Sequence, residues 1–153
     1  MKVIHIIPSA FDYFDDIRSQ AFKLLDAQTD SGLETEAFTL QYGVTTKSDR
    51  NVAAESAPSH EYKDTHNVGA LIASLDKYDI VHLHTPFFGA AGSILKWKRH
   101  KTSRPLVVTY YRDQILSDLF SVFVRLYNTF YLPKIFFIAD ALICPSFDNF
   151  NKS

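Results

Sequence analysis

Tyr78 to Asp113 reads YDIVHLHTPFFGAAGSILKWKRHKTSRPLVVTYYRD, and this stretch decides the fold. It holds two short apolar runs, Asp79 to His84 and Pro105 to Tyr110, on either side of a segment whose apolar residues have helical spacing. Short apolar runs of this kind are typical of buried strands. A helical connection joins such strands in parallel by a right-handed crossover. The stretch therefore predicts a strand, a helix and a parallel strand.

The flanking segments continue this alternation. Before the central stretch we predict strands at Val3–Ile7 and Glu34–Leu40, a helix between Phe14 and Gln28 that Gly32 ends, a short strand near His60–Tyr62 and a helix over Val68–Lys77. After it we predict helices over 114–131 and 133–138, a last buried strand over 141–145, and a helix from Phe147 capped by Ser146. This order predicts an α/β fold, a Rossmann-like doubly wound and mostly parallel sheet in three α/β/α layers. With 153 residues, we expect one domain over 1–153.

Ligands of open parallel sheets bind outside the carboxyl ends of the strands. The side chains at the ends of the two central runs and directly after them are His84, Thr85, Pro86, Tyr111, Arg112 and Asp113. For His84, a ligand contact and a bracing role at the turn are equally open, whereas His82 is interpreted as a structural histidine. Thr85 and Pro86 also suit the cap and the first position of a helix.

Composition excludes several classes of function. The net charge of −1 argues against a nucleic-acid binder, and the single cysteine, Cys144, suits a reducing cytosol. The first residues have too short an apolar run for a signal peptide, and charged residues interrupt every span of the roughly 20 residues that a bilayer requires. His60 and His66 lack the spacing of zinc ligands, so we predict no metal site. We expect a cytoplasmic protein.

The turn after the first strand argues against a cofactor. Pro8 to Asp16 contains no glycine and carries three carboxylates. A phosphate cradle needs close approach of the backbone, and carboxylates repel a phosphate. We therefore predict no dinucleotide or other cofactor, and we interpret Asp15 and Asp16 as helix-capping residues.

Two surface features each leave two interpretations. Positive charge gathers at the end of the central helix, in Lys96, Lys98, Arg99, His100, Lys101 and Arg104. It is either a solvated helix end or a contact with anionic lipid headgroups, with Trp97 as an interfacial anchor. The helix over 114–131 is apolar on two sides. We favour intramolecular packing of the surplus, and the alternative is contact with a lipid, a lipid-linked substrate or a second domain.

Three segments in this order, DIVHLHTP at 79–86, PLVVTYYRD at 105–113 and IADALICPS at 138–146, resemble the amino-terminal domain of glycosyltransferase family 4, enzymes of the GT-B fold. His82, His84 and Pro86 match the His-x-His-x-Pro type sequence of that family. The resemblance covers nearly the whole chain. It implies the acceptor side of an active site between two Rossmann-like domains. The second domain, which binds the nucleotide sugar, is absent from this chain.

The resemblance further implies the acceptor-binding half of a retaining glycosyltransferase. Such an enzyme moves a sugar from a nucleotide sugar to a glycan or lipid-linked acceptor, and we expect this half to be inactive alone. Tyr111 stands where the family commonly has a histidine. We predict it as the catalytic group through a hydrogen bond to the acceptor, because a phenol with a pKa of about 10 cannot replace imidazole as an acid or base. The predicted substrate-binding residues are Phe11, Asp12, His84, Thr85, Arg112 and Asp113.

The expected partners are the acceptor, a donor-binding domain or a partner chain that supplies it, and the inner face of a membrane. One alternative is a non-catalytic module with this fold that docks another protein through its aromatic helix. A flavodoxin-like binder of small molecules is disfavoured, because its glycine-rich phosphate turn is missing.

Overall fold

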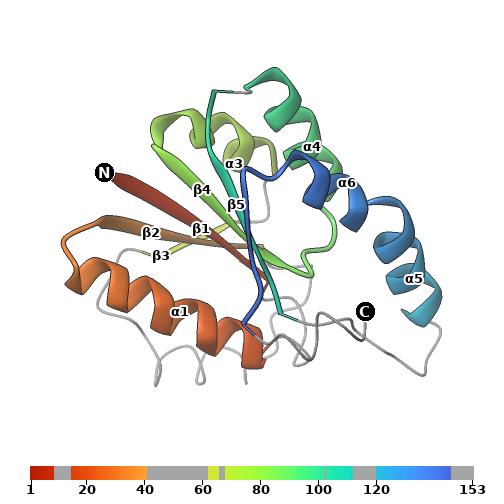
Figure 1. Ribbon diagram of the computed structural model, residues 1–153, viewed down its shortest axis with the longest axis horizontal. Coiled ribbons are helices and arrows are strands. Elements are labelled where there is room, and N and C mark those ends of the chain that lie inside the picture. The colour runs from red at the N-terminus through yellow and green to blue at the C-terminus, as the bar shows by residue number, and fades with distance from the viewer. Residues whose placement is uncertain (9–14, 41–61, 66–67, 102, 112–119, 146–153) are drawn as a thin grey trace.

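The computed structural model describes residues 1–8, 15–40, 62–65, 68–101, 103–111 and 120–145 (Figure 1). Its strands are β1 (Lys2–Pro8), β2 (Glu34–Leu40), β3 (Tyr62–Thr65), β4 (Ile80–Thr85), β5 (Leu106–Tyr110) and β6 (Ala141–Ile143). Its helices are α1 (Asp15–Asp30), α3 (Val68–Ser74), the 3-10 helix η2 (Leu75–Lys77), α4 (Ala91–His100), α5 (Phe120–Phe130) and α6 (Leu132–Ile138). The alternation predicted from the sequence is confirmed.

The six strands form one sheet in the order β3-β2-β1-β4-β5-β6, and each neighbouring pair is parallel. The chain first moves outward from β1 to β3 and then returns to add β4, β5 and β6 on the other side of β1. This is the doubly wound Rossmann order, whose direction reverses between β1 and β4. The predicted α/β fold is therefore confirmed, and the carboxyl ends of β1 and β4 mark the switch point where such sheets bind ligands.

The two faces of the sheet differ in chemistry. One face is mainly apolar on the central strands, where side chains such as Ile4, Ile6, Leu83 and Val108 join one core cluster with the helices α3, α4 and α6. The other face carries α1, which packs Ala21 and Leu25 against Ile7 and Ala37. Figure 1 shows α1 on one side of the sheet and α4 and α6 on the other. The three predicted layers are present.

The start of the central helix differs from the prediction. Thr85 and Pro86 do not open α4, which begins at Ala91. Thr85 is instead the last residue of β4, its hydroxyl donates to the Thr109 carbonyl oxygen at 3.0 Å, and its peptide bond to Pro86 is cis. The hydroxyl of Thr85 thus pairs with the neighbouring strand rather than with a helix end.

The last strand is less buried than predicted. Leu142 and Ile143 in β6 are each more than 40% exposed, because β6 is the edge strand of the sheet, and Cys144 is half-buried. The predicted helix from Phe147 with its cap Ser146 lies outside the described residues.

The basic residues at the end of α4 separate into two groups. Trp97 is buried and its indole N–H donates to Asp76 at 3.0 Å, so the alternative interpretation in which it is an interfacial anchor is wrong. Lys98 is buried too, and its ammonium lies 2.6 Å from an Asp140 carboxylate oxygen. Lys101 pairs with Asp76, and Arg104 donates to the Tyr78 carbonyl oxygen. Lys96, Arg99 and His100 are exposed.

The favoured interpretation of the aromatic helix is wrong for one of its rows. Val124 and Tyr127 in α5 are buried, but Val122, Leu126 and Phe130 are at least half exposed. The apolar surplus therefore lies on the surface. None of the helices in the described part of the chain is both long and apolar enough to cross a membrane.

The Lys98–Asp140 pair gives a prediction about stability. We expect Asp140→Ala to lower the free energy of unfolding by about 3 kcal/mol, because the buried ammonium of Lys98 loses its counter-charge. Lys98→Met should cost less, about 1 kcal/mol, because the half-exposed carboxylate can hydrate and still accepts from the Leu106 N–H at 2.7 Å. Urea unfolding of both variants checks this order. Equal losses would contradict the asymmetry.

Candidate functional site

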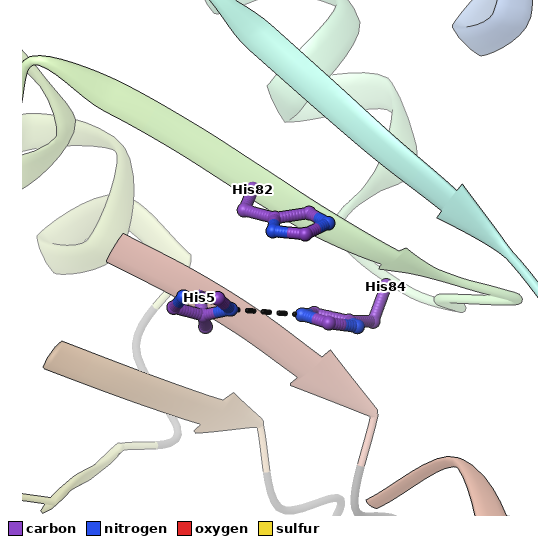
Figure 2. Close-up of side chains that lie close together, drawn as sticks. All are labelled: His5, His82 and His84. Atoms are coloured by element: carbon purple, nitrogen blue, oxygen red, sulfur yellow. Dashed lines mark hydrogen bonds between the residues drawn. The ribbon is translucent and has the colours of Figure 1, made fainter. Parts of the chain in front are cut away.

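A group of three histidines lies on the α1 face of the sheet at the switch point. Strand register sets it, since His5 in β1 pairs with His82 in β4, and His84 follows two residues later on the same face. All three side chains are buried, with His5 and His84 fully inaccessible. Figure 2 shows the His5 and His84 rings reaching across the gap between β1 and β4, with His82 beside them.

A chain of hydrogen bonds runs through two of these rings. The Tyr111 phenol oxygen lies 2.9 Å from His84 Nδ1, His84 Nε2 lies 3.0 Å from His5 Nδ1, and His5 Nε2 lies 2.9 Å from Gln28 Oε1. The amide oxygen of Gln28 can only accept, so His5 Nε2 carries a proton and His5 Nδ1 accepts. His84 must then donate from Nε2 and accept at Nδ1. The direction of the chain is fixed: Tyr111 donates to His84, His84 to His5, and His5 to Gln28.

His82 stands beside this chain rather than in it. Its Nε2 lies 2.7 Å from the Thr109 hydroxyl on β5, which supports its interpretation as a structural histidine. Its ring stacks on His84, with centroids 4.4 Å apart and planes inclined by 21°. His82 therefore contacts both Thr109 on β5 and the ring of His84.

Burial keeps all these groups neutral. Desolvation lowers the pKa of His5 to about 4, against a smaller opposing effect of its bond to Gln28. Desolvation, followed by repulsion from His5, lowers the pKa of His82 to about 3, and burial also lowers the pKa of His84 well below its ordinary value. Burial raises the pKa of the Tyr111 phenol to about 12. At neutral pH the site is therefore an uncharged, fully bonded network.

The arrangement suits hydrogen bonding better than metal binding. His5, His82 and His84 each offer a nitrogen within 4.8 Å of the others, the only such group of three potential ligands among the described residues. A shared ion would have to lie near the plane of each ring, but His82 and His84 are stacked. Both nitrogens of His84 already have partners. The ligand geometry of a tetrahedral centre is therefore not preformed.

Three of the predicted site residues meet at this edge of the sheet. Tyr111 and His84 are bonded to each other, and the Tyr111 N–H donates to the Thr85 carbonyl oxygen at 3.3 Å. Phe11, Asp12, Arg112 and Asp113 lie outside the described residues. Sequence reasoning missed His5 and Gln28. The available signal was a histidine in the middle of the apolar first strand, where a buried polar side chain requires a partner.

Acid should destabilise the protein through this site. Unfolded imidazoles bind protons below about pH 6.5, whereas the folded rings of His5 and His82 do so only near pH 4 and pH 3. Because the unfolded state binds more protons in this range, the free energy of unfolding has its highest value above pH 6.5 and decreases as the pH drops toward 4. Three such histidines give a slope of up to about 4 kcal/mol per pH unit near pH 5.

Urea unfolding between pH 7.5 and 4.5 measures this slope. The slope is proportional to the number of protons taken up on unfolding. We expect His82→Gln to lower this number by about one, because glutamine keeps a partner for Thr109 but does not titrate. His100→Gln, at the exposed end of α4, is the control and should leave the slope as it is. A slope unchanged by His82→Gln would show that the buried rings are not the cause.

Two comparisons with known proteins bear on this fold. One solved structure, an alpha-glucosyltransferase in complex with UDP and a 13-mer DNA containing a central A:G mismatch, superposes with a TM-score of 0.64 at 16% sequence identity. The match covers 99% of this chain and 39% of that one, so the present chain spans well under half the length of the enzyme and shares its fold. Among curated proteins, no sequence matches.

The family comparison is independent of that superposition. The model of Glycosyltransferase Family 4 matches residues 19–148, which include most of α1, the paired strands β4 and β5 and both histidines of the His-x-His-x-Pro sequence. This range is most of the chain, and its fold is that of a glycosyltransferase, as the resemblance in the sequence implied. The chain belongs to Glycosyltransferase Family 4.

Proposed function

We propose that this domain is the acceptor-binding half of a retaining glycosyltransferase that transfers a sugar from a nucleotide sugar to a glycan or lipid-linked acceptor. The observation that carries the proposal is the chain from Tyr111 through His84 and His5 to Gln28, which spans the switch point of a family 4 fold. Ligands of open α/β sheets bind outside the carboxyl ends of the strands at this point. Tyr111 is the member of the chain next to that edge.

The chemistry of Tyr111 in this proposal is positioning. Its phenol stays protonated at neutral pH and donates to His84, which leaves the phenolic oxygen free to accept from an acceptor hydroxyl. The imidazoles behind it have lowered pKa values and are poor bases. A retaining transfer depends on orientation of the hydroxyl and on electrostatic relief of the leaving diphosphate, so a neutral, rigid hydrogen-bond partner suits it. In this role Tyr111 touches the acceptor, while His84, supported by His5, holds the Tyr111 phenol in position.

Donor binding belongs to a second domain in this proposal. The present chain covers 39% of the alpha-glucosyltransferase whose structure was solved with UDP, which leaves the larger part of such an enzyme to supply the nucleotide-sugar site. The first turn of the chain lacks the glycines of a phosphate cradle. Phe11, Asp12, Arg112 and Asp113 would complete the acceptor side, together with Thr85. The domain alone should not transfer sugar.

The location in the same proposal is cytoplasmic, with contact to the inner face of a membrane. A cysteine, Cys144, that forms no disulfide suits a reducing compartment, and a lipid-linked acceptor would require the domain to work at a membrane surface.

The proposal predicts binding of an acceptor without a donor. Titrated into the labelled chain, octyl glucoside below its micelle concentration and methyl mannoside should shift the backbone amide signals of Thr85 and Tyr111, whereas UDP-glucose should not. Tyr111→Phe should weaken glycoside binding by about tenfold, the value of one hydrogen bond in a desolvated site. Tyr110→Phe is the matched control, because Tyr110 lies on the opposite face of β5 and packs against Phe136.

Two results would contradict the acceptor role. The first is UDP-glucose binding at Thr85 and Tyr111, which would make this the donor side. The second is an equal loss of affinity in Tyr111→Phe and Tyr110→Phe, which would remove the phenol of Tyr111 from the site. A chain that binds none of the sugars but captures a partner protein would support the non-catalytic module instead.

A further inference from the structure

A groove of about 610 Å³ lies on the outer surface of the helical layer that covers the apolar face of the sheet. Its lining residues come from α4, α5 and the start of α6, and Figure 1 shows α6 lying between α4 and α5. The lining residues are Gly92, Leu95, Lys96, Arg99, His100, Leu126, Phe130, Tyr131 and Lys134. This surface is separate from the histidine network, which lies on the other face of the sheet.

Apolar side chains project around this groove into solvent. Val122, Leu126 and Phe130 follow one another at four-residue steps along α5, and all three are at least 50% exposed. On α6, Phe137 is 90% exposed and stands three residues after Lys134, on the same side of the helix. A fully exposed phenylalanine beside an exposed apolar row is unusual for a surface that faces only water.

The charged side chains that line the groove in the described part of the chain are all basic. They are Lys96, Arg99 and Lys134, and none of the described lining residues is acidic. Lys96, Arg99 and Lys134 form no ion pair within the described part of the chain, although other cations of α4 do. Among the described acids, Asp140 pairs with Lys98, and Asp76 pairs with Lys101 and accepts from the Trp97 N–H. Lys96, Arg99 and Lys134 therefore have no acidic partner within the described residues, and the occupant that complements them is anionic.

We propose that this groove and the apolar row beside it dock the domain on an anionic phospholipid bilayer. Lysine and arginine beside exposed aromatic and aliphatic side chains is the composition of interfacial membrane-binding surfaces, in which the apolar residues enter the headgroup region and the cations meet the phosphates. A free phosphate ion would leave Phe137, Leu126 and Phe130 unexplained. The inference rests on the membrane contact in the proposed function, and it replaces Trp97 with Phe137 as the aromatic residue that enters the interface.

Vesicle flotation tests this proposal with the chain as it exists. Vesicles of phosphatidylcholine with 30% phosphatidylglycerol should carry the protein, and vesicles of phosphatidylcholine alone should carry much less. Lys96→Glu with Lys134→Glu should weaken binding by at least roughly 30-fold, at about fivefold for each basic residue lost. Raising the salt concentration from 0.1 to 0.5 M should also weaken vesicle binding, because salt screens exposed charges.

Matched variants separate the groove from net charge. Lys23→Glu with Lys77→Glu makes the same change of charge at two exposed lysines outside the groove and should alter binding by less than twofold. Phe137→Ser should weaken binding by about tenfold, since one exposed ring no longer enters the interface. Circular dichroism and thermal unfolding confirm that all variants fold.

Three outcomes would overturn the proposal. They are equal binding to neutral and anionic vesicles, an equal loss in the two double variants, and no binding of the wild-type chain at low salt. A wild-type dimer that Lys96→Glu with Lys134→Glu dissociates would assign the groove to a second copy of the chain instead. None of these measurements uses a sugar, so failure here leaves the acceptor-binding test of the transferase proposal unaffected.

Discussion

The pairing of β1 with β4 is the interaction on which the rest of the structure depends. It places His5 opposite His82 and brings His84 within hydrogen-bond distance of His5, across the point where the strand order reverses. Ionised imidazoles are too costly to bury there, so the rings are neutral, and each has one donor and one acceptor nitrogen. All the bonds of such a network run in the same direction, and the acceptor oxygen of Gln28 at one end sets that direction. Tyr111 at the other end is thereby held as a donor to His84.

The sheet divides stability and chemistry between its faces. The apolar face gathers most of the core with α3, α4 and α6, and Lys98 with Asp140 closes that layer at the edge near β6. The polar face carries His5, His84 and Thr109 under or beside α1. Because alternate residues of a strand point to opposite faces, a single strand such as β4 serves both purposes. This division explains why the histidines can be arranged for hydrogen bonding while Val81 and Leu83, the residues that precede His82 and His84 in β4, remain in the core.

How much the sequence predicts follows from whether a signal is local. Strands and helices were predicted well, because periodicity is a local property, and Tyr111 and His84 were found from their places at strand ends. His5 and Gln28 were missed because their contacts are distant in the sequence. His84 lies 79 residues from His5 and Gln28 lies 23 residues from it, and only the fold brings them together. Thr85 was misread as a helix cap because its hydroxyl prefers a carbonyl of the neighbouring strand. The sequence left open an interfacial role for Trp97 because its partner, Asp76, lies on a different helix.

A direct connection joins the two proposed sites. The turn that follows β4 holds Phe87, whose backbone N–H donates to the Tyr127 hydroxyl on α5 at 3.2 Å. The Tyr127 ring also packs edge-on against Phe88. Helix α5, which carries the exposed apolar row, is therefore hydrogen-bonded to the segment that directly follows Thr85 at the carboxyl end of β4. In a domain that meets both a bilayer and a lipid-linked acceptor, this anchoring would fix the height of the acceptor-binding edge above the membrane. In such a domain the geometry of β4 and its following turn would constrain the reach of the acceptor, as it sets the place of the histidines.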